Sequence, residues 1–322
     1  MIISRTPLRV SFLGGGTDFP EFYNEHGGAV LSTAIDKYIY VVVKKRFDEK
    51  IVLHYTKTET LDNVEEIQHD IIRECMRLVG VEKGIEITTL ADIPSEGTGL
   101  GSSSSLTVGL LLALYTYLGI QNIPPDLLAE DACKVEIAIM GKSMGIQDPY
   151  IAAYGGLRMF TYDKDGVDAS HFKRRIRKQV GDRILLFYSG MTRQATGILD
   201  EQKERIPANV ETLKKMLEIA IIGKDYLDIE QYDNFGALIK KSWELKKTLA
   251  SNITNDSLTD ILADASNAGA LGYKICGAGG GGFLLIYCKD GGQDNIRKVM
   301  SKYQELPIKI EEQGSKIIYQ EG

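Results

Sequence analysis

The feature that most constrains the fold is a run of glycines and serines leading directly into an apolar stretch. Residues 97–105 read GTGLGSSSS, and residues 106–115 read LTVGLLLALY. Because the second stretch is apolar on nearly every side of a helical projection, it predicts a buried helix. The first N–H groups of a helix lack intrahelical acceptors and carry partial positive charge. Glycines there let a phosphate approach the backbone, so the segment predicts an anion site.

The alternative for this segment is a flexible loop with an ordinary serine N-cap. Four consecutive serines before a buried helix favour the anion site, and one of their hydroxyls could ligate Mg²⁺. No Gly-Lys-Ser/Thr sequence follows the glycines, so this is not a Walker A loop. Another group must therefore replace the lysine of that loop.

A second glycine cluster, residues 277–282, reads GAGGGG and formally matches G-x-G-x-x-G. The strand-like run FLLIY follows it, where a dinucleotide-binding fold needs a helix, so that interpretation fails. A tight hairpin remains open. We favour a backbone that packs closely against a ligand or against the first glycine segment.

A third cluster, LGGGTD at residues 13–18, follows the strand-like residues 7–12. It places Arg9 and Asp18 on either side of a backbone without side chains, and such a turn could bind a polyol. Asp18 as the N-cap of a following helix is an equally weighted alternative, since Pro20 suits an early helical position.

Two acids are candidates for chemistry. Glu136 lies on a predicted helix over residues 126–140 with apolar neighbours one turn away on both sides. A buried carboxylate is costly unless paired, coordinated or protonated, so a metal or cation partner is expected, with a structural salt bridge as the alternative. Asp148 follows in GIQDP, where a turn could bring both acids to one cleft. Phosphoryl transfer needs Mg²⁺ on the phosphate oxygens and an acid that orients or deprotonates the attacking hydroxyl.

The rest of the chain predicts an α+β protein of two domains. Its 322 residues exceed what one core usually supports. The first half alternates strand-like runs with helices, and the second has long amphipathic helices between about 196 and 270 followed by strands.

Composition excludes several classes. A net charge of −6 gives no general attraction to nucleic acid, and the basic run 173–178 lacks interleaved aromatics. Four distant cysteines indicate neither a disulfide framework nor a zinc site. No signal peptide or stretch long enough to span a bilayer is evident. We expect a cytoplasmic protein that binds neither membrane nor nucleic acid.

Taken in order, the three glycine segments resemble those of the GHMP kinase superfamily over essentially the whole chain. The resemblance implies a ribosomal-protein-S5-like βα domain over residues 1–190 and a ferredoxin-like domain over 191–322, with ATP and a sugar meeting between them. It implies Ser103 and Glu136 as Mg²⁺ ligands, and Asp148 with Arg9 as catalytic residues, Asp148 acting as a base or only orienting the hydroxyl. It implies ATP contacts from Gly97, Thr98, Gly99, Gly101, Ser102, Ser103, Ser104, Gly279 and Gly280.

Residues 14–16 are Gly-Gly-Gly where galactokinases have Gly-Glu-His, which makes a plain galactose kinase a weaker expectation. Together with GIQDPYIAAYGGL at 145–157 and LFYSGMTR at 186–193, this turn resembles the D-glycero-D-manno-heptose 7-phosphate kinase branch, near the fucokinase domains. That branch transfers the ATP γ-phosphate to the anomeric hydroxyl, giving a 1,7-bisphosphate for nucleotide-heptose synthesis. A kinase of a free sugar such as L-fucose or galactose, and a non-catalytic sugar-sensing homologue, are the alternatives.

The expected partner is thus a sugar or sugar phosphate, and a homodimer is left open. The predicted substrate contacts are Arg9, Gly15, Gly16, Thr17, Asp18, Asp148, Arg158 and Arg193. Of these, the two later arginines are candidates for a substrate phosphate because a guanidinium matches phosphate oxygens, with Lys142 as a further candidate.

Overall fold

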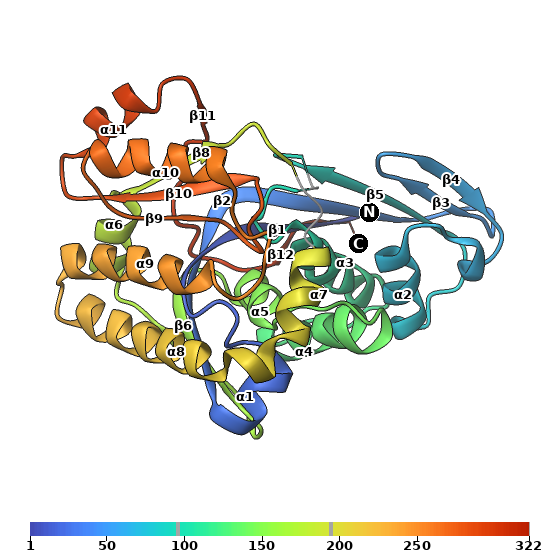
Figure 1. The fold of residues 1–322 in the computed structure, drawn as a ribbon. Coiled ribbons are helices and arrows are strands. Elements are labelled where there is room, and N and C mark those ends of the chain that lie inside the picture. The colour runs from blue at the N-terminus through green and yellow to red at the C-terminus, as the bar shows by residue number, and fades with distance from the viewer. Residues whose placement is uncertain (95–96, 193–195, 322) are drawn as a thin grey trace.

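The computed structural model describes residues 1–94, 97–192 and 196–321, arranged as two sheets with packed helices (Figure 1). The larger sheet has the order β12-β1-β2-β5-β3-β4, with β6 paired to β2 and β7 paired to β6. Its strands are β1 (Ile2–Leu13), β2 (Gly28–Lys45), β3 (Ile51–His54), β4 (Thr58–Leu61), β5 (Ile85–Ala91), β6 (Leu157–Asp163), β7 (Gly166–His171) and β12 (Lys316–Gln320). The last strand of the chain therefore pairs with the first.

Strand β2 is 18 residues long and organises the larger sheet. Its first part pairs with β6 and its second part with β5, while β1 runs antiparallel along both. Residues 28–35 are buried on both faces, which removes the alternation that marks a half-exposed strand.

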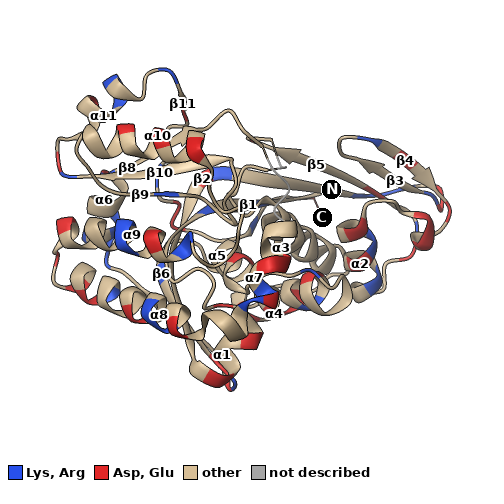
Figure 2. Cartoon of the chain, in the orientation of Figure 1, with Lys and Arg blue, Asp and Glu red and all other residues tan. Residues whose placement is uncertain are grey.

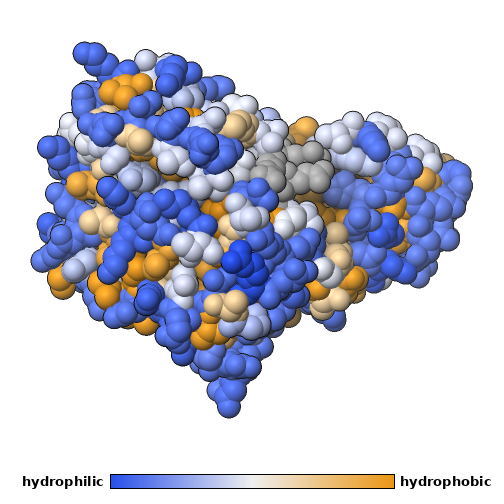
Figure 3. Space-filling model, viewed as in Figure 1, coloured by the Kyte–Doolittle hydropathy of each residue, from blue (hydrophilic) through white to orange (hydrophobic). Residues whose placement is uncertain are grey.

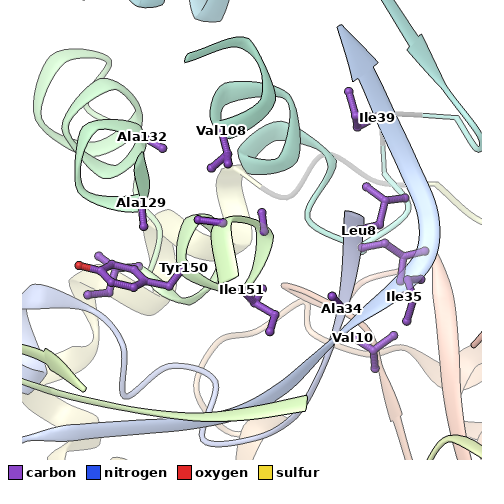
Figure 4. Close-up of a cluster of buried hydrophobic side chains, with 14 of the residues drawn as sticks. Leu8, Val10, Ala34, Ile35, Ile39, Val108, Ala129, Ala132, Tyr150 and Ile151 are labelled. Atoms are coloured by element: carbon purple, nitrogen blue, oxygen red, sulfur yellow. The ribbon is translucent and has the colours of Figure 1, made fainter. Parts of the chain in front are cut away.

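Helix α3 (Ser102–Tyr117) packs on β1 and β2 and is buried along most of its length, which confirms the predicted apolar helix. It is covered by α2 (Asp70–Val79), α4 (Pro125–Cys133) and α5 (Gln147–Tyr154). Figure 4 shows side chains of β1, β2, α3, α4 and α5 that share one apolar core. The core residues labelled there are Leu8, Val10, Ala34, Ile35, Ile39, Val108, Ala129, Ala132, Tyr150 and Ile151.

The smaller sheet is antiparallel with the order β11-β8-β10-β9. Its strands are β8 (Ile184–Tyr188), β9 (Ala270–Ile275), β10 (Phe283–Cys288) and β11 (Gln304–Glu305). In Figure 1, α10 (Asp256–Asn267) and α11 (Gln293–Val299) lie on one side of it, and α8 (Ile206–Asp228) and α9 (Tyr232–Lys246) on the other. Both α8 and α9 also contact β1, so they join the two sheets. The α+β expectation is confirmed.

The shorter helices are α1 (Pro20–His26), α6 (Arg174–Gly181) and α7 (Thr196–Glu204), with a 3₁₀ turn η1 (Val64–Glu66) and a π-helical turn η2 (Lys134–Ile139). Strand β8 lies before residue 190 and belongs to the smaller sheet, whereas β12 returns to the larger one. The division of domains at residue 190 remains a prediction.

The charged residues of α8 and α9 include both signs (Figure 2). On the face shown in Figure 3, apolar groups are scattered among hydrophilic ones. Within the described ranges, no helix combines the length and apolarity needed to cross a membrane.

Candidate active site

The glycine-serine segment forms the N-terminus of α3. Gly97, Gly99 and Gly101 have φ angles of 67°, 75° and 79°, which residues with a side chain rarely adopt. No side chain caps the helix, and the Ser102 hydroxyl is buried without a hydrogen-bond partner in the described part of the chain. These groups line a cavity of about 280 Å³, together with Thr98, Ser103, Ser104 and Gly279. The helix end thus offers unpaired donors to an anion.

The second glycine segment packs against the first. The amide of Phe283, which directly follows the segment, donates to the carbonyl of Thr98 at 3.1 Å. A Cβ at Gly277 would lie 2.8 Å from the Cα of Gly99, and one at Gly282 would lie 2.5 Å from the Thr98 carbonyl oxygen. Of the favoured interpretation, the packing on the first glycine loop is confirmed. The segment also joins the antiparallel strands β9 and β10, so the hairpin that was the alternative is present as well.

Glu136 lies in the π-helical turn η2 and is completely buried. Ser103 and Ser104 donate their hydroxyl groups to its two carboxylate oxygens at 2.5 and 2.7 Å. Lys142 Nζ lies 2.8 Å from Glu136 Oε1 and 2.7 Å from Ser103 Oγ. The salt bridge that was the alternative is therefore present. This salt bridge lies in the wall of the cavity beside the α3 N-terminus. A ligand for a metal ion bound to the phosphates would have to lie in the same wall.

Arg9 and Asp148 form a bidentate pair. Arg9 donates from Nε and Nη2 to the two Asp148 carboxylate oxygens at 2.7 and 2.6 Å, and from Nη1 to the Gly99 carbonyl at 2.6 Å. Burial disfavours the charged guanidinium, but the adjacent Asp148 raises the pKa of Arg9 overall. Arg9 therefore fixes the orientation of Asp148 and ties it to the glycine loop.

The LGGGTD turn holds Asp18 inside the protein. Its Oδ1 accepts from the Gly16 amide at 2.8 Å, and its Oδ2 accepts from Gln147 Nε2 at 3.0 Å. Burial raises the pKa of Asp18, against the effect of the Gly16 amide. Helix α1 begins at Pro20 with Phe19 in the N-cap position and no side-chain cap, so the capping role weighed for Asp18 is not observed.

A second cavity of about 70 Å³ lies on the other side of Asp148. Arg9, Gly15, Gly16, Asp18 and Asp148 all line it, so most predicted substrate residues meet here. It is also lined by Gln147, Lys246 and Lys274, which the sequence interpretation missed. The two lysines lie far away in sequence within an ordinary helix and strand, and no local motif distinguishes them.

A larger cavity, about 610 Å³, adjoins the serines. It shares Ser102 and Ser103 with the cavity at the α3 N-terminus. Its apolar lining includes Ile39, Ile71 and Leu90. Asp92 and His69 are among its polar groups. A large, mainly apolar space next to an anion site suits a planar base joined to phosphates.

Some predicted residues lie elsewhere. Thr17 lines neither cavity beside Asp148, because its hydroxyl bonds to the Gly14 and Ala29 carbonyls at 2.8 and 3.0 Å. Arg158 also lines neither; it donates to the Gly155 carbonyl and lies over the Tyr154 ring. Gly280 donates its amide to the Ile253 carbonyl outside the cavity lining. Arg193 lies outside the described residues.

Comparison with known proteins identifies two family domains in the chain. The GHMP kinases N terminal domain matches residues 65–156, and the GHMP kinases C terminal domain matches residues 224–305. The chain is 28% identical to D-glycero-alpha-D-manno-heptose 7-phosphate kinase of Campylobacter jejuni, covering 94% of both chains. It is 28% identical to an L-fucokinase/L-fucose-1-P guanylyltransferase of Bacteroides fragilis, with 95% of this chain but only 37% of that protein covered.

A mevalonate kinase of Methanothermobacter thermautotrophicus is 30% identical over 68% of this chain and 69% of its own. Among solved structures, a D-glycero-D-manno-heptose 1-phosphate kinase from Bacteroides thetaiotaomicron superposes with a TM-score of 0.81 at 22% identity, covering all of both chains. That likeness confirms the two-domain fold. The matched domains and the relatives together show that this chain belongs to the GHMP kinase family.

Proposed function

We propose that the protein is an ATP-dependent sugar phosphate kinase, and that its acceptor is the anomeric hydroxyl of D-glycero-D-manno-heptose 7-phosphate. The observation that carries the proposal is that Arg9 and Asp148 line both the cavity at the α3 N-terminus and the polar cavity beyond it. A side chain that lines both cavities can contact the phosphate of the donor in one and the hydroxyl of the acceptor in the other.

The nucleotide would occupy the two larger cavities. Its triphosphate fits the α3 N-terminus, where amides, the Ser102 hydroxyl and the helix dipole favour negative charge. Its base fits the adjoining cavity of about 610 Å³, bounded by Ile71 and Leu90. Ser102 and Ser103 line both cavities, so one nucleotide can extend from one into the other.

The residues present fit Mg²⁺, which prefers oxygen ligands. Ser103 and Glu136 offer them at the wall of the phosphate cavity, and the buried carboxylate needs a positive partner, now supplied by Lys142. No three His, Cys, Asp or Glu side chains of the described ranges cluster to hold a metal. A Mg²⁺ here would therefore complete its ligands with phosphate and water oxygens, and would neutralise phosphate charge.

Asp148 is placed to receive the acceptor hydroxyl. As the hydroxyl oxygen bonds to the γ-phosphorus, the bond to the ADP oxygen breaks and the hydroxyl proton leaves, toward Asp148 or toward solvent. Arg9 holds the carboxylate in one orientation throughout. Because positioning supplies most of the catalysis in phosphoryl transfer, this fixed pair suits the reaction whether Asp148 acts as base or only orients the hydroxyl.

The heptose phosphate acceptor is supported by the Campylobacter jejuni relative, which aligns over nearly the whole of both chains. The Bacteroides fragilis relative supports L-fucose as a second candidate. With either acceptor, we expect a cytoplasmic location, where ATP is available.

The test is Mg²⁺-dependent ADP release with a panel of D-glycero-D-manno-heptose 7-phosphate, mannose 6-phosphate, L-fucose and galactose, with phosphorus NMR of the products. A new anomeric phosphate on the heptose 7-phosphate is the expected result. Turnover with free sugars alone would transfer the assignment to a free-sugar kinase, and absence of turnover with every sugar would contradict kinase activity.

A further inference from the structure

Two lysines from the second half of the chain point to a subsite in the smaller cavity. Lys246 is the last residue of α9 and Lys274 lies in β9. Each is only 7% exposed, and both line the cavity of about 70 Å³ that also contains Asp18 and Asp148. Lysines are rarely buried to this degree unless they are paired.

Neither lysine has a carboxylate within salt-bridge distance in the described part of the chain. Lys246 Nζ donates to Gln202 Oε1 at 2.6 Å and, weakly, to the Gly15 carbonyl at 3.4 Å. Lys274 Nζ has only the Phe12 carbonyl at 3.4 Å among the described residues. An ammonium group has three donors, so among the described residues half of the six donors are unused, and two of the three bonds that form are long. Burying positively charged donors without partners costs free energy unless an anion binds to them.

The neighbouring acids are already engaged. Asp148 accepts from Nε and Nη2 of Arg9, and Asp18 accepts from the Gly16 amide and from Gln147. The Arg9–Asp148 pair has no net charge. The other charged groups of the cavity are the two ammonium groups and the carboxylate of Asp18. The cavity therefore has a surplus of positive charge before any ligand enters. Separately from this charge balance, burial lowers the pKa of both lysines to about 8.

We propose that Lys246 and Lys274 bind the phosphate that the acceptor already carries, and so select a phosphorylated sugar over a free one. This rests on the proposed function. The cavity is far smaller than the roughly 300–1,000 Å³ of a site for a whole ligand, which suits one charged end of a molecule. Asp148 lines both this cavity and the larger one at the α3 N-terminus, so an acceptor that extends between them can place its phosphate at the lysines and its anomeric hydroxyl at the carboxylate.

Binding without turnover separates this inference from the kinase proposal. Isothermal titration, with ATP absent, would compare D-glycero-D-manno-heptose 7-phosphate with unphosphorylated D-glycero-D-manno-heptose on the wild type, Lys246→Met, Lys274→Met and the control Lys241→Met. Lys241 lies on the same helix with an exposed side chain. Each buried-lysine variant should weaken binding of the phosphorylated sugar by roughly 10- to 100-fold, as expected for loss of a charged hydrogen bond. Binding of the free sugar should not change.

Thermal unfolding checks the fold of the variants. Because methionine removes a buried charge without a partner, both variants should unfold at or above the wild-type temperature. Equal loss of binding for both sugars, or no loss for the phosphorylated one, would overturn the subsite. A failure of the proposed function would appear separately, as wild-type enzyme that releases no ADP with the sugar phosphate.

Discussion

Gly99 lies directly against the carbonyl of Cys276, so close that a Cβ at position 99 would lie 2.5 Å from that oxygen. Gly99 also has a φ of 75°, and its own carbonyl accepts from Arg9. One backbone position thus joins the phosphate-loop candidate, the strand that ends at Ile275 and the Arg9–Asp148 pair. A side chain at position 99 must displace the glycine loop, the backbone at Cys276 or the Arg9–Asp148 pair.

Gly99→Ala should therefore damage both stability and nucleotide binding. Gly119→Ala is a matched control, because Gly119 has a similar φ of 82°, yet a Cβ there would meet no atom of the described residues within 4 Å. Both substitutions incur the positive-φ strain, and only the first adds a clash. We expect Gly99→Ala to lose about 1–3 kcal/mol more in the free energy of unfolding, with a raised KM for ATP. Equal effects in urea unfolding would contradict the close contact.

Asp148→Asn tests the role of the carboxylate. The amide keeps the size of the side chain but cannot take a proton, and it lacks the charge that pairs with Arg9. We expect kcat to fall by about 10²–10⁴-fold, the usual contribution of a positioned acid or base, with the Kd for ATP retained. Asp165→Asn, at an exposed turn, is the control. Near-normal turnover by the Asp148 variant would remove it from the mechanism.

Glu136→Gln tests the metal site. The amide preserves the contacts with the serine hydroxyls in part but removes the negative charge that Lys142 now balances. Because the affinity of an oxygen site for a divalent cation follows its charge, the Mg²⁺ concentration for half-maximal activity should rise on the order of tenfold. The control is Glu130→Gln on the exposed side of α4. An unchanged Mg²⁺ requirement would show that Glu136 serves only the salt bridge.

Local sequence predicted the parts of the site that are carried by motifs. The glycines at 97, 99 and 101 adopt the positive φ angles that only glycine adopts easily, and the hydroxyl run begins α3. The burial of Glu136 followed from the apolar residues around it, although Ile139 is exposed. The π-helical turn changes which side chains share a face, and helical periodicity alone does not reveal such a turn.

Other parts depend on tertiary packing that no local pattern encodes. Lys246 and Lys274 enter the site only because α9 packs beside β1 and β9 packs on α9. Thr17 belongs to a motif of the site, yet its hydroxyl is used to fasten the turn to the start of β2. Arg158 is close in sequence to Asp148, but its strand, β6, carries it away from both cavities. Proximity in sequence to Asp148 therefore did not place Arg158 in either cavity.

The groups around the two buried lysines determine how the acceptor cavity responds to pH. Asp148 raises the pKa of Arg9 further above its already basic value, so the guanidinium stays charged. Burial raises the pKa of the Cys276 thiol to about 11, so it stays neutral up to pH 9. The acids of the cavity are Asp18, whose pKa burial raises from an acidic starting value, and Asp148, which is paired with Arg9. Among these groups, Lys246 and Lys274 are the ones expected to titrate between pH 7 and 9, each with a pKa of about 8.

The KM for the sugar phosphate should consequently rise above pH 8. Below that pH both lysines are protonated and the phosphate, whose second pKa is near 6, is largely dianionic, so binding is strongest near pH 7 to 8. Above it, binding must first protonate the lysines, which costs about tenfold per pH unit for each one. The stability of the free protein has the opposite trend: between pH 8 and 10.5 the unfolded lysines hold protons that the folded ones have lost, so the free energy of unfolding increases with pH. Steady-state KM measurements from pH 7 to 9, with Lys246→Met expected to show a shallower rise, test this. A KM that is flat over that range would mean that neither ammonium group binds the acceptor.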